Sequence, residues 1–169
     1  MSKSTTRVRP SKIEYYMRLA EDAAMRSHDA ETQVGMLLVR KDTGAIIATG
    51  YNGFIRGADD ASLPNTRPDK YPLMMHAEDN IICHCARHGI SMQGCFIVCP
   101  ISPCAACTRR LWQCGISEAI VKGFHPTFEE VKKMPDMKVL IDPFENAGTQ
   151  YYKLMYSPRM NSVPELKGA

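Results

Sequence analysis

A helix is predicted near the start of the chain. Ser11 and Glu14 have the spacing of a capping box, and apolar residues then recur every three or four positions, as on one face of a helix. These apolar residues are Ile13, Met17, Ala20 and Ala24. The pattern predicts a helix over about 11–27 whose apolar face packs on a sheet.

Two apolar, β-branched runs follow, VGMLLVR and AIIATG, with KDTG between them. Such runs on either side of a turn sequence predict an antiparallel hairpin over about 34–50. A stretch rich in Gly, Asn, Asp and Pro then occupies 51–72. Loops of this length inside a compact domain are usually functional or disordered.

Helical and strand patterns alternate after this loop. The elements predicted are a helix at 76–88, a strand at 95–99, a helix at 104–114 and a strand at 118–122. A helical stretch at 127–134, a short apolar run at 138–141 and an amphipathic stretch at about 145–155 follow. The alternation predicts an α/β protein, a three-layer α/β/α sandwich. We expect one domain over 1–169, with a basic N-terminal tail at 1–10 and a C-terminal tail at 157–169.

The composition is ordinary for a soluble globular protein, with 44% apolar and 23% charged residues among 169. No apolar run approaches the roughly 20 residues of a membrane span, and the start of the chain lacks the apolar core of a signal peptide. We therefore expect a cytoplasmic protein without a membrane partner. A net charge of +3 does not by itself indicate nucleic-acid binding.

Seven cysteines are present, and a reducing compartment favours metal or thiolate chemistry over a disulfide framework. Cys104 and Cys107 have the i, i+3 spacing that places two thiolates on one face at a helix start. His76 begins the preceding helix, and successive crossover units usually lie side by side. We therefore expect these three residues to surround one metal ion.

A His-Cys-Cys set leaves one position of a tetrahedral Zn²⁺ open, as in catalytic zinc sites, and zinc lowers the pKa of a bound water to about 7. Glu78, two residues after His76, would act as general acid and base. HAE at 76–78 and PCAAC at 103–107 also match H-x-E…P-C-x-x-C, the signature of zinc-dependent nucleobase deaminases. The pattern indicates hydrolytic deamination.

Another interpretation is a structural zinc site, closed by a fourth protein ligand. The candidates for that ligand are Cys83, His84, Cys85, Cys99 and Cys114. The protein would then be a zinc-stabilised interaction module without catalytic activity. Buried cysteines also behave as small apolar residues, which is the alternative for Cys95, Cys99 and Cys114.

Five stretches together resemble the deoxycytidylate (dCMP) deaminase family, over roughly residues 12–125. They are MRSHDAETQVG at 25–35, GYNGFIRGADD at 50–60, LPNTRPDKYP at 63–72, HAEDNII at 76–82 and SPCAACTRRLWQCGI at 102–116. The resemblance implies hydrolysis of dCMP to dUMP and ammonia, which supplies thymidylate synthesis. It also implies a cytidine-deaminase-like fold with a central mixed sheet of five strands.

The resemblance assigns roles to individual residues. It implies that His76, Cys104 and Cys107 bind Zn²⁺ and that Glu78 moves protons. The substrate contacts it implies are Asn52 on the deoxyribose or phosphate, the Ala77 N–H on the pyrimidine O2, the Ser102 carbonyl on the exocyclic amine, and Arg26 on the phosphate. Phe124 stands where the family usually has a tyrosine, so stacking on the pyrimidine is expected without a hydroxyl contact.

Many family members are hexamers activated by dCTP and inhibited by dTTP, so the resemblance implies a homo-oligomer, with a hexamer favoured. The expected effector site, with Mg²⁺ accompanying the nucleotide, consists of Phe54, Arg56, Gly57, Asp59 and Asn80. One zinc per chain is expected. Some members carry a second, structural zinc on cysteines of the first half, but no cysteine precedes Cys83 here.

A tRNA or single-strand nucleic-acid base deaminase would use the same zinc motif. It would need a basic track with stacking aromatic residues, whereas this chain is nearly balanced in charge, contains 8% aromatic residues and has acidic residues at Asp59 and Asp60. We therefore expect no nucleic-acid partner. A riboflavin-pathway deaminase is a further rival, disfavoured because no reductase domain follows.

Overall fold

The computed structural model describes residues 8–159, so most of both predicted tails lies outside the described residues. The elements in chain order are α1 (Lys12–Ala24), β1 (Gly35–Arg40), β2 (Ile46–Tyr51), α2 (Ala77–His88), β3 (Cys95–Ile101), α3 (Ala105–Gln113), β4 (Glu118–Gly123), α4 (Phe128–Lys132), β5 (Met137–Asn146) and β6 (Thr149–Pro158). The strands form one mixed sheet in the order β2-β1-β3-β4-β6-β5. None of the helices in 8–159 is long and apolar enough to cross a membrane.

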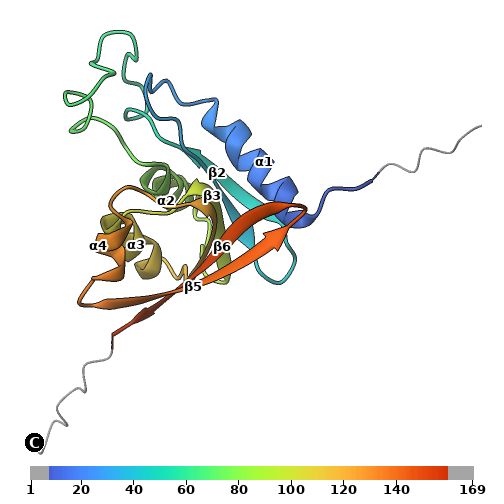
Figure 1. Ribbon diagram of the computed structural model, residues 1–169. Helices are drawn as coiled ribbons and strands as arrows, with labels where there is room; N and C mark the ends of the chain where they lie inside the picture. Colours follow the sequence, from blue (N-terminus) through green and yellow to red (C-terminus); the bar gives the residue numbers. More distant parts are fainter. Residues whose placement is uncertain (1–7, 160–169) are drawn as a thin grey trace, which may run out of the picture.

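Helix α1 covers one face of the sheet (Figure 1). The predicted capping box is present, because the Ser11 hydroxyl accepts from the Glu14 N–H while the Glu14 carboxylate accepts from the Ser11 N–H. The helix ends at Ala24, three residues before the expected end, where the chain turns through shorter i→i−3 bonds. Its buried residues are Tyr16, Met17, Ala20 and Ala24, the last three as predicted.

Helices α2, α3 and α4 cover the opposite face (Figure 1). Their apolar side chains pack with those of the sheet in a second core cluster, whose fully buried members include Ile81, Ile97, Leu111 and Leu154. Helices on both faces of one sheet confirm the predicted three-layer α/β/α sandwich.

The neighbouring active-site strands β2, β3 and β4 point in the same direction. Strand β1 runs antiparallel to both β2 and β3, so β2 and β3 are parallel, and β4 pairs parallel with β3. The carboxyl ends of β2, β3 and β4 therefore meet at one edge of the sheet. The segments that follow β2 and β3 lead into α2 and α3, which places both helix N-termini at this edge.

The sheet has six strands, and the expected number of five was wrong. The amphipathic stretch at 145–155 lies in a long hairpin of β5 and β6, paired from Met137↔Pro158 to Asn146↔Thr149. The two turn residues, Ala147 and Gly148, have φ of 50° and 74°, the left-handed pair that a tight hairpin turn requires. Strand β6 continues to Pro158, so the expected start of the C-terminal tail at 157 was too early.

Helix α1 packs closely over Gly35 at the start of β1. A Cβ added there would lie 2.0 Å from the Ala20 carbonyl oxygen and 2.4 Å from the Ala24 nitrogen. We predict that Gly35→Ala lowers the free energy of unfolding by about 3 kcal/mol or more, because a packed helix backbone would have to move. Urea unfolding measures this change. Gly123→Ala is the matched control, since nothing lies within 4 Å of a Cβ on that strand glycine; equal losses in both variants would contradict the prediction.

Candidate active site

Two helix N-caps face each other at the edge where the parallel strands end. His76 is the N-cap of α2 and Cys104 is the N-cap of α3. Both have extended backbone, and neither side chain makes the capping hydrogen bond usual at this position. The two side chains therefore remain available to each other and to a ligand.

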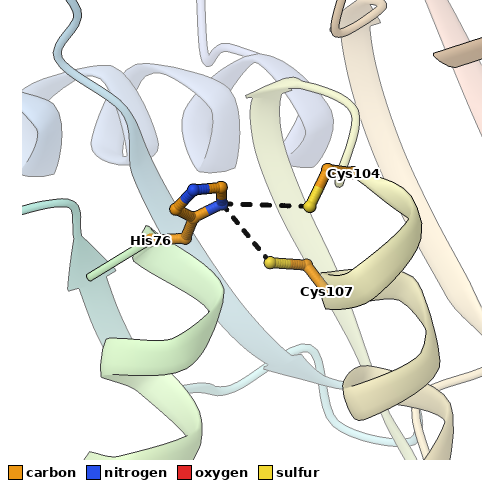
Figure 2. Close-up of side chains that lie close together, drawn as sticks. All are labelled: His76, Cys104 and Cys107. Atoms are coloured by element: carbon orange, nitrogen blue, oxygen red, sulfur yellow. Dashed lines mark hydrogen bonds between the residues drawn. The ribbon is translucent and has the colours of Figure 1, made fainter. Parts of the chain in front are cut away.

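His76, Cys104 and Cys107 converge on one point (Figure 2). The His76 Nδ1 lies 3.5 Å from the Cys107 Sγ and 3.9 Å from the Cys104 Sγ, and all three ligand atoms lie within 4.8 Å of one another. Among the described residues, this is the one group of three or more such donors that has this geometry.

The donor set fits zinc, since an imidazole nitrogen and two cysteine sulfurs are typical zinc ligands. The other cysteines do not join the cluster. Cys85, Cys95 and Cys99 are buried in the core, Cys114 is partly buried against it, and Cys83 is exposed. Within residues 8–159 the grouping has three donors, which is the number that leaves a tetrahedral ion one open position.

The three groups share protons when no cation is present. A hydrogen bond from Cys107 and the nearby His76 imidazole lower the pKa of Cys104 to about 3. The same Cys104 contact, together with burial, raises the pKa of Cys107. The hydrogen bond to Cys104 also raises the pKa of His76. A divalent cation would displace the protons held by Cys107 and His76, so metal uptake is coupled to proton release.

Glu78 lies in the first turn of α2 and is only 6% exposed. Burial raises the pKa of its carboxyl group to about 7, although the positive charge of His76 favours the carboxylate. A carboxyl group with this pKa exchanges protons readily near neutral pH, as a general acid and base must.

The remaining predicted substrate residues surround the same edge. Ala77 is the first residue of α2, so its N–H is among those a helix leaves without an intrahelical partner. Ser102 follows β3 and is buried, and its hydroxyl accepts from the His125 N–H at 2.9 Å. Phe124 follows β4, is 38% exposed and packs against Phe128 with ring centroids 4.5 Å apart.

Asn52 and Arg26 differ in how much freedom the structure leaves them. The Asn52 amide nitrogen donates to Asp29 Oδ2 and the Thr32 carbonyl, and its Oδ1 accepts from the Val34 N–H at 2.8 Å. These three hydrogen bonds fix the orientation of the buried Asn52 side chain. Arg26, in contrast, is exposed to solvent, two residues beyond the end of α1.

The predicted effector residues differ in how exposed they are and in what they contact. Phe54 is buried and packs on His28, with ring centroids 4.2 Å apart. Arg56, Gly57 and Asp59 are exposed in the long loop. Asn80 binds the end of β2, because its side-chain nitrogen donates to the Tyr51 carbonyl at 2.7 Å.

Two features near the site were not predicted from the sequence. Asp29 and Lys70 form a buried ion pair beside Asn52. Burial alone would raise the pKa of Asp29, but hydrogen bonds from Lys70 and from the Thr32 and Glu31 amides lower it overall. No pattern in the sequence links Asp29 to Lys70.

The second feature is Arg110, whose Nη1 lies 3.8 Å from the Cys107 Sγ.

Comparison with known proteins agrees with this site. The family model for the cytidine and deoxycytidylate deaminase zinc-binding region matches residues 10–122. The deoxycytidylate deaminase of Mus musculus is 31% identical over 163 residues, which cover 91% of this chain and 90% of that protein. The deoxycytidylate deaminase of Homo sapiens is 35% identical over 113 residues, 63% of this chain and 62% of that protein.

The fold is shared with a solved structure. The dCMP deaminase of cyanophage S-TIM5, in complex with dCMP and dUMP, superposes with a TM-score of 0.62 at 25% identity, covering 75% of this chain and 94% of that chain. The sandwich and its His-Cys-Cys cluster with a buried glutamate define a deaminase with the cytidine-deaminase-like fold. The chain belongs to the cytidine and deoxycytidylate deaminase family.

The burial of Glu78 generates a prediction about stability. In zinc-free protein above pH 7, wild type must bury a charged carboxylate, and raising its pKa from 4.5 to about 7 corresponds to about 3 kcal/mol. We predict that Glu78→Gln raises the free energy of unfolding by about that amount at pH 8. Below pH 4.5 the gain disappears, because Glu78 is then protonated in both folded and unfolded chains. Urea unfolding of the reduced, zinc-free proteins at the two pH values tests this; an unchanged or less stable variant at pH 8 would contradict it.

Proposed function

We propose that the protein hydrolyses dCMP to dUMP and ammonia, with one Zn²⁺ held by His76, Cys104 and Cys107. The observation that carries the proposal is the convergence of three zinc donors, with the buried Glu78 two residues after one of them, His76. Family membership supports the reaction class. The deoxycytidylate deaminase relatives and the cyanophage enzyme bound to dCMP and dUMP support the substrate.

When bound, Zn²⁺ supplies Lewis-acid activation of water, lowering its pKa to about 7. Glu78 moves the protons of the reaction. Its carboxylate takes a proton from the attacking water and delivers it to the pyrimidine N3. It then takes the second proton, from the hydroxyl group now on C4, and delivers it to the amine, which departs as ammonia while the C4 carbonyl forms. General acid–base catalysis of this kind contributes typically about 10²–10⁴-fold in rate. A carboxyl pKa near 7 suits a group that must both accept and donate protons.

Residues at the strand ends orient the substrate. The Ala77 N–H donates to the pyrimidine O2, and the Ser102 carbonyl accepts from the exocyclic amine. Phe124 stacks on the pyrimidine, and its partial exposure beside Phe128 supports this role. The exposed Arg26 binds the 5′-phosphate, since charge-assisted hydrogen bonds contribute about 1.5–3 kcal/mol.

Asn52 contacts the deoxyribose. Both of its amide donors are engaged within the protein, whereas its Oδ1 accepts one hydrogen bond and has a second lone pair. A lone pair accepts from a sugar hydroxyl but repels a phosphate oxygen. The structure therefore favours the sugar over the phosphate as the partner of this residue.

The proposal extends to regulation and location. The protein acts in the cytoplasm as a homo-oligomer, with a hexamer favoured, activated by dCTP and inhibited by dTTP. The effector nucleotide, accompanied by Mg²⁺, binds at Phe54, Arg56, Gly57, Asp59 and Asn80. The exposure of Arg56 and Asp59 supports this site, because a triphosphate needs a cation and a metal ion needs a carboxylate.

Ammonia release tests the reaction and its substrate together. We predict turnover of dCMP in preference to dCTP, deoxycytidine and cytidine-containing RNA, and one Zn²⁺ per chain by metal analysis. Glu78→Gln should retain the zinc and lose at least about 10²-fold in kcat, because it cannot move the protons.

Each result separates the proposal from its rivals. Preference for RNA would identify a nucleic-acid deaminase. Full activity in Glu78→Gln would contradict the mechanism, and a zinc-bound wild type without activity on any of these substrates would indicate an interaction module.

A further inference from the structure

A buried charge cluster lies outside the metal site, at the base of the long loop that leads to it. The Lys70 Nζ lies 2.5 Å from Asp29 Oδ1 and 3.0 Å from Glu31 Oε2. The side chains of Lys70 and Asp29 are each 3% exposed. Removing one member of such a pair leaves an uncompensated buried charge, which typically costs about 3–5 kcal/mol.

Asp29 joins this cluster to the end of β2. Besides Lys70, its carboxylate accepts from the Glu31 N–H at 2.8 Å, the Thr32 N–H at 2.9 Å and the Asn52 side chain at 3.2 Å. Lys70 therefore neutralises one of the groups that hold Asn52 in place.

Asn52 and Gly53 in turn hold the residue before His76. The Asn52 N–H donates to the Val34 carbonyl at 3.1 Å. Gly53 and Met75 form an isolated antiparallel bridge, with N–H···O distances of 3.1 and 2.8 Å. Met75 directly precedes His76, so this bridge sets the direction in which the chain enters α2.

Lys70 also reaches the same segment through its own backbone. Its carbonyl accepts from the N–H groups of Leu73 and Met74, both at 3.0 Å. The Lys70 ammonium group thus binds Asp29 and Glu31 in the segment after α1. The Lys70 backbone carbonyl stabilises the turn that leads to His76. The two ends of the loop, at Gly53 and at Lys70, are attached to one another through Asp29.

We infer that Lys70 is a positioning residue of the active site, which keeps the His76 imidazole on the side where Cys104 and Cys107 lie. The inference rests on the proposed zinc site. Lys70 acts through the backbone and does not contact the substrate. Loss of Lys70 should loosen the zinc as well as destabilise the fold, because the entry of α2 loses its anchor.

Lys70→Met tests this inference, with Arg67→Met as the matched control. Arg67 is a cation of the same loop, pairs with the same Glu31 at 3.7 Å and donates to the Thr32 hydroxyl at 2.6 Å. Its side chain is 47% exposed, however, and it makes no ion pair or hydrogen bond with Asp29. For Lys70→Met we expect zinc release to a chelator about 10–100-fold faster than in wild type, because losing a group that orients a metal ligand typically lowers metal affinity by that factor. We expect kcat for dCMP to fall more than KM rises. Arg67→Met should stay within about twofold of wild type in both measurements.

A folded Lys70→Met protein that releases zinc at the wild-type rate would overturn the inference, even if its stability is reduced. If that variant does not fold, hydrogen exchange of the wild type decides. The amide protons of Met75, Glu31 and Thr32 should then exchange as one cooperative unit, and independent, faster exchange at Met75 would overturn the inference. A wild type that binds no zinc would contradict the proposed function instead.

Discussion

The parallel direction of β2, β3 and β4 is the constraint on which the active site depends. It brings the ends of three strands to one edge of the sheet and turns the N-termini of α2 and α3 toward each other. His76 and Cys104 then face one another as N-caps, although they are 28 residues apart in the chain. Positive potential at two helix N-termini favours the thiolates that a zinc ion requires. A different direction for β2 or β3 would separate the three donors.

The protein buries acidic groups at this edge in two opposite ways. Asp29 is paired with Lys70 and accepts several hydrogen bonds, which keep its pKa low and make it part of the scaffold. Glu78 is buried near the metal donors, and its pKa rises to about 7. The Asp29–Lys70 pair holds the chain in place. The burial of Glu78 lowers the free energy of unfolding but provides a group that exchanges protons near neutral pH. Such a loss of stability is typical of functional sites.

Local signals in the sequence were sufficient to predict much of this architecture. The capping box at Ser11 located α1, the glycines after α2 and α3 marked their ends, and the motif spacing predicted the three donors that converge in the structure. The β5–β6 hairpin was missed because Ala147-Gly148 is a weaker turn signal than Asn-Gly or Asp-Gly. The Asp29–Lys70 pair could not be predicted, since the two residues lie 41 positions apart and no periodic pattern relates them.

The number of sulfur atoms around the metal tests the central claim most directly. Zinc K-edge X-ray absorption of the purified protein resolves sulfur neighbours at about 2.3 Å from nitrogen or oxygen neighbours at about 2.0 Å. The convergence of His76, Cys104 and Cys107 predicts two sulfur neighbours per zinc, with nitrogen or oxygen completing the shell. Three or four sulfur neighbours would show that another cysteine closes the site, which would contradict a catalytic zinc centre.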